Sequence, residues 1–159
     1  MFHTLWQNYI APVLRRPARF QVAALCYRQA AGGPEILLIT SRETKRWVLP
    51  KGWPKSGLEA AGTAIEEAWE EAGVITRSHT PPLVGTYRYD KRLRGGVPVE
   101  TVVNVYAISV KALHDDYPEK DERDRVWKTA SAAAAAVDEP ELKDLLLRFP
   151  AQLQDGLSG

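Results

Sequence analysis

Cysteine is almost missing from this chain of 159 residues, which contains only Cys26. A single thiol cannot form an internal disulfide, and it cannot build a cysteine-based zinc cluster. Cys26 lies within the apolar run Val22–Tyr27, which predicts a buried and inert thiol. Because disulfides are rare in reducing compartments, one lone cysteine also fits a cytoplasmic protein.

The chain also lacks an excess of charge and a long apolar run. Its formal net charge is +1, so nothing draws the whole surface toward nucleic acid or an acidic membrane. Any anion must therefore be recognised by a local cluster of basic residues. No apolar run approaches the roughly 20 residues that a membrane-spanning helix needs. We expect neither nucleic acid nor membrane as a partner.

The N-terminal segment does not have the order of a secretory signal, because its arginines follow the apolar part. Residues 2–10 are predicted to form a short helix or an extended arm packed on the domain. A membrane-surface anchor is the alternative. We place this arm at residues 1–19, a single domain at 20–150 and a C-terminal tail at 151–159.

Hydrophobic residues make up 45% of the chain, which is enough for one domain with a core. Apolar runs bounded by Gly and Pro predict strands at 20–27, 35–40, 47–49, 81–89 and 97–110, with a short one at 126–128. Helical spacing and propensity predict helices at 58–72, 130–137 and 139–149. Strands, helix, strands and helix in this order indicate an α+β or layered α/β domain.

The most informative segment is the helix expected at 58–72, which carries four glutamates within six residues. Ala61, Ile65, Ala68 and Ala72 recur at helical spacing and predict its buried stripe. The glutamates, at 66, 67, 70 and 71, are expected roughly opposite this stripe. Gly73 follows as the expected C-terminal cap.

Carboxylates three and four positions apart on a helix repel each other, by about 0.2–0.5 kcal/mol per pair. A plain acidic surface helix is one interpretation. Three features oppose it: the acids occupy one arc without alternating lysines, a Gly/Pro loop precedes the helix, and basic residues cluster in other segments. A hard divalent cation, which prefers oxygen ligands, is the natural partner for such an arc.

Gly52–Val74 resembles the Nudix box, G-x5-E-x7-R-E-U-x-E-E-x-G-U, where U is apolar. The matching positions are Gly52, Glu67, Ala68, Glu70, Glu71, Gly73 and Val74. Two positions depart from the box. Leu58 replaces its first glutamate, with Glu59 one place later, and Glu66 replaces its arginine. In the family that arginine is thought to orient the catalytic carboxylates, so a lysine or arginine from another segment must substitute, or activity is reduced or absent.

Three flanking segments extend the resemblance to the diphosphoinositol-polyphosphate phosphohydrolase branch. They are Ala24–Arg28 (ALCYR), the LLIT strand with SRETKRWVLPKGW, and Arg123–Trp127 (RDRVW). Residues from about 20 to 149 are covered. The resemblance implies an α/β/α sandwich with a mixed sheet, and hydrolysis of a phosphoric anhydride bond with Mg²⁺ or Mn²⁺.

The resemblance also implies roles for individual residues. Metal ligands are expected from Glu67, Glu71 and then Glu70, with the backbone carbonyl of Lys51. Glu67 is the preferred general base, with Glu70 and Glu66 as the other catalytic candidates. Substrate phosphates are expected to bind Arg19, Arg28, Arg42, Lys45, Arg46, Lys51, Arg123 and Arg125. A solvated surface charge is the alternative for each of these eight.

For Trp47 and Trp53, packing in the core is favoured over a wall that contacts substrate. Lys91 is expected at a hairpin tip, from which it can still close over a charged substrate. The expected substrate is a small phosphate-rich molecule, of the diphosphoinositol polyphosphate or the diadenosine polyphosphate type. The alternative is a Nudix-fold ligand-binding or sensor protein with weakened catalysis. Both a monomer and a homodimer are compatible with the sequence.

Overall fold

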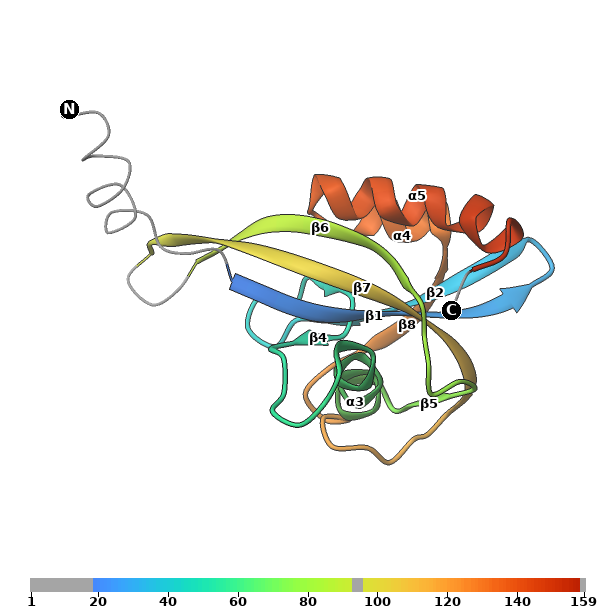
Figure 1. Cartoon of the computed structure of the whole chain (residues 1–159), viewed down its shortest axis with the longest axis horizontal. Coiled ribbons are helices and arrows are strands. Elements are labelled where there is room, and N and C mark those ends of the chain that lie inside the picture. The colour runs from blue at the N-terminus through green and yellow to red at the C-terminus, as the bar shows by residue number, and fades with distance from the viewer. Residues whose placement is uncertain (1–18, 93–95, 158–159) are drawn as a thin grey trace.

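The computed structural model describes residues 19–92 and 96–157, so the expected N-terminal arm lies outside the described residues. Helices cover both faces of one sheet: α4 and α5 pack on one face and α3 on the other (Figure 1). The elements run β1 (Arg19–Ala30), β2 (Gly33–Thr40), β3 (Trp47–Val48), β4 (Lys51–Gly52), α3 (Ala60–Ala72), β5 (Val74–Thr76), β6 (Leu83–Arg92), β7 (Pro98–Leu113), β8 (Arg125–Thr129), α4 (Ala130–Ala136) and α5 (Pro140–Gln154). The expected α/β/α sandwich is confirmed.

The sheet is mixed, as predicted. Its main path has the order β3-β2-β1-β7-β5, and β8, β4 and β6 pair with β2, β1 and β7. Strands β1 and β7 are parallel, with Val22 opposite Asn104, whereas β1 runs antiparallel to β2 and β4. Strand β1 is thus central, and it holds the short β4 directly beside helix α3.

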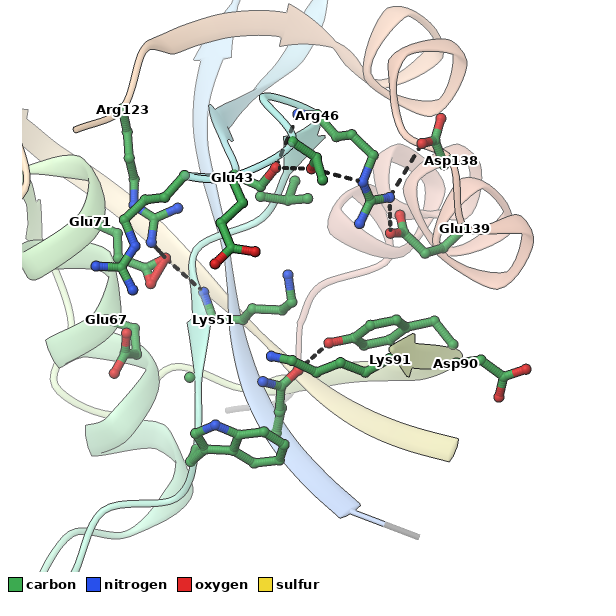
Figure 2. Close-up of a pocket in the computed structure, with 18 of the residues that line it drawn as sticks. Glu43, Arg46, Lys51, Glu67, Glu71, Asp90, Lys91, Arg123, Asp138 and Glu139 are labelled. Atoms are coloured by element: carbon green, nitrogen blue, oxygen red, sulfur yellow. Dashed lines mark hydrogen bonds and ion pairs between the residues drawn. The ribbon is translucent and has the colours of Figure 1, made fainter. Parts of the chain in front are cut away.

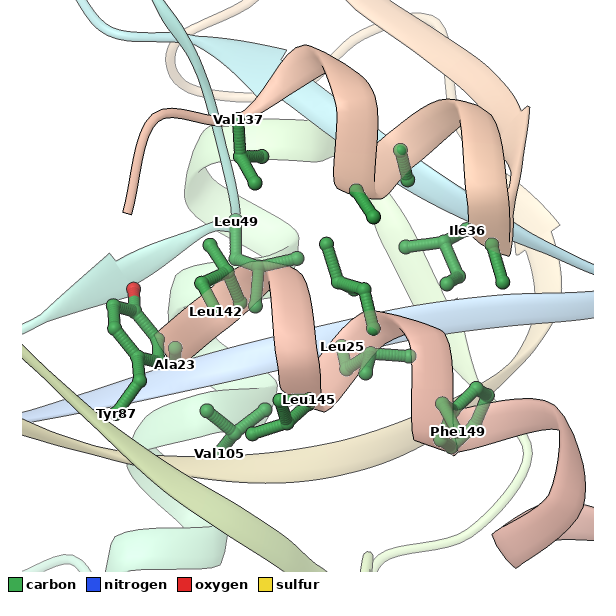
Figure 3. Close-up of a cluster of buried hydrophobic side chains, with 14 of the residues drawn as sticks. Ala23, Leu25, Ile36, Leu49, Tyr87, Val105, Val137, Leu142, Leu145 and Phe149 are labelled. Atoms are coloured by element: carbon green, nitrogen blue, oxygen red, sulfur yellow. The ribbon is translucent and has the colours of Figure 1, made fainter. Parts of the chain in front are cut away.

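Alternating side chains of β1 supply two cores, because successive residues of a strand point to opposite faces. Ala23 and Leu25 face α4 and α5 (Figure 3). Ala24 and Cys26 face α3. Cys26 is buried as predicted, and burial raises the pKa of its thiol well above its usual range.

Helix α3 buries the predicted Ala68 and Ala72, but its buried stripe is rotated away from Ala61 and Ile65. Ala64, Ala68 and Ala72 pack in the core beneath the sheet, whereas Ala61 and Ile65 are only half-buried. Glu67 and Glu71 lie on the buried side, 7% and 5% exposed. The expectation that all four glutamates face away from the sheet was therefore wrong for these two.

Gly73 ends α3 in the left-handed conformation, with φ of 68°. A Cβ at this position would lie 2.6 Å from the backbone oxygen of His114, so a side chain is excluded by space as well as by conformation. The chain continues directly into β5, a strand of three residues that the sequence pattern did not predict. The cap thereby holds the end of the glutamate helix against the loop that follows β7.

Two further boundaries differ from the prediction. Helix α3 begins at Ala60 rather than at residue 58. Helix α5 continues through Pro150 to Gln154, so a tail beginning at residue 151 was wrong for its first four residues. The extension follows from packing, because Leu153 and Leu157 contact the core beneath α5.

Within 19–92 and 96–157, no helix has both the length and the apolar character required to cross a bilayer. The cytoplasmic location stays a prediction.

Candidate active site

A cleft of about 1200 Å³ is lined by residues from both the sheet and helix α3. Its walls come from β1, the loop after β2, the segment from β4 to residue 55, helix α3, β6, and the loops before β8 and α5. Figure 2 shows Glu67 and Glu71 on one side of this cleft, and Asp138 and Glu139 on the other. Segments that are far apart in sequence thus meet around one hollow.

The Glu67 carboxylate packs directly on the backbone of Gly52. A Cβ built at Gly52 would lie 2.5 Å from both Cδ and Oε1 of Glu67, which is closer than real side chains approach. The first glycine of the box-like segment therefore makes the space in which this carboxylate lies. Strand β4 fixes the glycine there by pairing with Val22 of β1.

We expect Gly52→Ala to lower any activity of the cleft on the order of a hundredfold, because misplacing a reacting group by about 1 Å has effects of this size. Stability should change little, since the displaced atoms are the flexible end of Glu67. Gly62→Ala on α3 is the matched control, because its Cβ meets only Leu58 at 3.7 Å. Steady-state rates and thermal melting check this, and an unaltered rate in Gly52→Ala would contradict it.

Glu71 is buried between α3 and β4. Its Oε1 accepts a hydrogen bond of 3.4 Å from the Lys51 N–H and lies 3.5 Å from Nη2 of Arg123. Burial raises the pKa of the Glu71 carboxyl to about 8, Arg123 opposes the rise, and the adjacent Glu67 carboxylate adds to it. A carboxylate in such a position attracts a cation strongly.

Lys55 lies among the remaining carboxylates. Its Nζ is 3.1 Å from Glu66, 2.9 Å from Glu67 and 3.3 Å from Glu70. Partial burial lowers the pKa of Lys55, because it disfavours the charged amine. Hydrogen bonds to Glu67 and Glu66 outweigh this effect, so the pKa of Lys55 is raised overall. The Lys55 hydrogen bond also lowers the pKa of Glu66. Lys55, which lies within the box-like segment itself, thus places a positive charge beside the glutamate that replaces the box arginine.

The donors at this end of the cleft suit a hard cation in kind, because they are carboxylate oxygens. In the described ranges, no three Asp, Glu, His or Cys side chains already converge as a metal site. Lys55 contacts Glu66, Glu67 and Glu70, and Arg123 contacts Glu71. A divalent cation bound by Glu67, Glu71 and Glu70 would displace the Lys55 amine from Glu67 and Glu70.

Four of the eight basic residues expected at the site line the cleft. These are Arg42, Arg46, Lys51 and Arg123. Arg123 also donates to the Thr40 carbonyl and pairs with Glu119. Glu119 also lines the cleft.

The other four basic residues do not line this cleft. Arg125 donates to the carbonyls of Ala72 and His114, so it caps the end of α3. Arg28 pairs with Glu35 and stacks on Trp127.

Lys45 and Arg19 are also outside the lining of the cleft. Lys45 Nζ lies 3.4 Å from the Glu122 carbonyl, and Arg19 lies over the Trp53 ring at 5.8 Å. The positions of these residues along a strand or loop did not show whether each basic side chain would point toward the cleft or away from it.

The sequence interpretation missed several cleft residues. Lys55 and the pair Asp138–Glu139 were not singled out, although Lys55 lies within the box-like segment. Trp53 is 39% exposed and lines the cleft, so the preference for core packing was wrong for this residue. Trp47 packs against the core as expected.

A family model described as the NUDIX domain matches residues 19–149. The chain belongs to the Nudix family. Its box is the segment from Gly52 to Val74, and the cleft lies over this segment. Of the two departures from the Nudix box, Leu58 is 44% exposed and does not line the cleft, whereas Glu66 contacts Lys55.

Curated relatives match over part of their length. Diphosphoinositol polyphosphate phosphohydrolase 3-beta of Bos taurus is 32% identical over 87 residues, which cover 54% of this chain and 52% of that protein. Diphosphoinositol polyphosphate phosphohydrolase 2 of Mus musculus is 31% identical over 86 residues, covering 54% and 47%. The chain thus spans about half the length of the curated relatives it matches.

Solved Nudix structures share the fold at lower identity. A C. elegans Ap4A hydrolase in a binary complex gives a TM-score of 0.59 at 23% identity, covering 86% of this chain and 98% of that one. A NUDIX hydrolase from Nitrosomonas europaea gives 0.65 at 16% identity, covering 85% and 90%. These likenesses concern the fold.

Proposed function

We propose that this chain is a metal-dependent Nudix pyrophosphohydrolase, which cleaves a diphosphate linkage in a small phosphate-rich substrate. The observation that carries the proposal is the burial of Glu67 and Glu71 side by side at the cleft, with Arg123 and Lys55 against them. Two buried adjacent carboxylates are costly for a fold unless a cation compensates them. The names of the curated relatives, all phosphohydrolases, support the same reaction.

Glu67, Glu71 and Glu70 would hold the cation, together with the backbone of Lys51. Mg²⁺ and Mn²⁺ are the proposed ions, since both accept carboxylate and carbonyl oxygen. When bound, such an ion neutralises phosphate oxygens and makes a water molecule more acidic. Glu71 is kept in place by the Lys51 N–H and Arg123, and Glu67 by its fit over Gly52.

Glu67 is our proposed general base, because it lies at the cleft wall and its position is fixed by its fit over Gly52. A positioned base contributes typically about 10²–10⁴-fold. Glu70 and Glu66 are the other candidates for proton transfer, and both are more exposed than Glu67. Arg42 and Arg123 would bind the phosphate oxygens, for which the guanidinium fork is suited.

The test is release of phosphate or of a nucleotide product from a panel of diphosphate compounds, with Mg²⁺, with Mn²⁺ and with EDTA. The panel includes diadenosine tetraphosphate, ADP-ribose and a diphosphoinositol polyphosphate. We expect turnover of at least one compound, and its loss with EDTA. Turnover that survives EDTA would remove the metal from the proposal. Binding without any turnover would favour the sensor hypothesis instead.

A further inference from the structure

The loop at 114–124, between β7 and β8, is hydrogen-bonded to the end of α3. The His114 N–H donates to the Gly73 carbonyl at 2.8 Å, and the Glu119 N–H donates to the Glu70 carbonyl at 3.0 Å. The last four carbonyls of a helix lack partners within the helix, so the loop supplies a donor that α3 cannot. The last turn of α3, which carries two of the four glutamates, is therefore supported by a segment distant in sequence.

Arg123 connects this loop to the buried carboxylate of Glu71. Its side chain is 10% exposed, and its Nη2 lies 3.5 Å from Oε1 of Glu71 and 3.0 Å from Oε1 of Glu119. Its Nε also donates to Glu119, at 3.1 Å. Figure 2 shows the Arg123 side chain extending toward Glu71. One guanidinium thus lies between a carboxylate of the loop and a carboxylate of the helix.

The end of β2 fixes the orientation of this guanidinium. Arg123 Nη1 donates to the Thr40 carbonyl at 3.0 Å. Thr40 is itself buried, and it exchanges two further hydrogen bonds with Asp124: its N–H donates to the Asp124 carbonyl, and its hydroxyl accepts from the Asp124 N–H. Because a guanidinium is planar and its N–H groups point in fixed directions, the contacts with the Thr40 carbonyl and with Glu119 leave little freedom for the group that faces Glu71.

We propose that Glu119 and Arg123 are positioning residues for the cation site: Glu119 orients Arg123, and Arg123 orients Glu71. Neither is a ligand in this assignment. The inference rests on the proposed function, because that function gives Glu71 to the cation. It leaves the phosphate contact of Arg123 possible, since arginine has five N–H donors and the contacts with Glu71, Glu119 and Thr40 use four of them.

The charge of Arg123 and its geometry have opposite effects on metal binding. A positive charge close to Glu71 repels a divalent cation, so charge alone predicts that Arg123 weakens metal binding. Groups that orient a metal ligand have the opposite effect, and their removal typically lowers metal affinity by about 10–100-fold. Metal affinity therefore distinguishes a positioning residue from a nearby charge.

The first experiment measures Mn²⁺ affinity by electron paramagnetic resonance, without substrate, in wild type and in Arg123→Lys. Lysine keeps the charge but lacks the planar fork, so it cannot contact Thr40, Glu119 and Glu71 together. We expect Mn²⁺ to bind about tenfold more weakly. Unchanged or tighter binding overturns the inference, because an effect of charge alone predicts no loss.

Arg46→Lys is the matched control for this experiment. Arg46 also lines the cleft and also pairs with two carboxylates, those of Asp138 and Glu139, but it lies on the side opposite Glu71 (Figure 2). Arg46→Lys should leave the Mn²⁺ affinity unchanged. An equal loss in this variant overturns the inference, since it shows that any such substitution in the cleft weakens the site.

The second experiment uses Glu119→Asp, which keeps the charge and shortens the side chain by one methylene. We expect weaker Mn²⁺ binding than in wild type, with a loss no larger than that of Arg123→Lys. The double variant should bind Mn²⁺ as Arg123→Lys does, because Glu119 acts through Arg123. Additive losses overturn the inference, since they show that Glu119 acts independently of Arg123, as a ligand would.

Glu122→Asp is the control within the same loop, because Glu122 is half exposed and does not line the cleft. It should leave the Mn²⁺ affinity unchanged. Thermal melting in EDTA shows which variants are folded. If Arg123→Lys does not fold, Glu119→Asp decides against this control, and equal Mn²⁺ affinities of the two variants overturn the inference.

These measurements separate the inference from the proposed function, because they need no substrate. Weaker Mn²⁺ binding by Arg123→Lys and Glu119→Asp supports the positioning role even if no diphosphate compound is turned over. Unchanged Mn²⁺ affinity in both variants overturns the positioning role even where metal-dependent hydrolysis is observed. A loss of stability alone does not lower the Mn²⁺ affinity of the folded molecules, so a merely structural role of the pair predicts unchanged affinity.

Discussion

Glu71→Gln is expected to lower hydrolysis by about a hundredfold or more while leaving the metal-free fold intact. The side chain keeps its size and can still accept from the Lys51 N–H, but the cation loses a charged ligand. Losses of this order accompany the removal of ligands and supporting groups at metal sites. Steady-state kinetics at saturating Mg²⁺ measures the effect, and rates equal to wild type would reject Glu71 as a ligand.

Metal-free stability gives this variant an independent readout. Because the pKa of Glu71 is raised to about 8 in the folded protein, against about 4.3 in an unfolded chain, the fold favours the protonated carboxyl. The resulting penalty is absent below the unfolded pKa, grows as pH rises, and is complete above about pH 8. Glu71→Gln removes this penalty.

Urea unfolding in EDTA at pH 5 and at pH 8 tests whether the charge on Glu71 destabilises the fold as the pH rises. The free energy of unfolding of Glu71→Gln, relative to that of wild type, should be higher at pH 8 than at pH 5. Glu59→Gln, which removes a charge from the exposed N-terminus of the same helix, should show no such gain. A pH-independent difference between Glu71→Gln and wild type would contradict the assigned burial of the charge.

The second large effect is expected at Lys55. Its amine contacts Glu66, Glu67 and Glu70 at 2.9–3.3 Å, and a divalent cation must compete for the same oxygens. We expect Lys55→Met to bind Mn²⁺ about tenfold more tightly, because the competing charge is removed at close range. Without metal, the same variant should melt a few degrees lower, since the carboxylates then repel one another without compensation.

Two variants sharpen this test. Lys55→Arg keeps the charge and should behave like wild type in both measurements. Lys120→Met removes another ion-paired lysine, the partner of Asp116, at an exposed position outside the cleft, and should leave Mn²⁺ affinity unchanged. Electron paramagnetic resonance of free Mn²⁺ and thermal melting in EDTA provide the two readouts. Weaker Mn²⁺ binding by Lys55→Met would show instead that the amine orients the ligands.

Hydrophobic periodicity and turn residues were sufficient to predict most of the helices and strands. The long strands β1, β6 and β7 and the three helices lie close to their predicted ranges, because their apolar repeats are strong and are bounded by Gly or Pro. The short β4 and β5 were missed as strands. Two or three residues have no usable period, and they form strands only because β1 and β7 lie beside them.

For helix α3, which carries the four glutamates, the sequence pattern was not sufficient to predict the buried face. Its alanines and its glutamates are both arranged at helical spacing, so the sequence could not decide how far the buried face extends around it. Glu67 and Glu71 are turned inward because β4 passes over them and Gly52 leaves room for a carboxylate. Nothing in the local pattern distinguishes them from Glu66 and Glu70, which face Lys55 near the surface.

The sequence by itself determined the family, the location of the carboxylate box and the Gly73 stop, because these depend on local spacing and on side chains close to one another in the chain. Only the tertiary structure decided which basic residues reach the cleft, that Lys55 contacts the box carboxylates, and that Glu139 lies on the side of the cleft opposite the box. These features join residues up to 93 positions apart, such as Arg46 and Glu139. Sheet pairing and helix packing bring them together, and neither can be read from a short window of sequence.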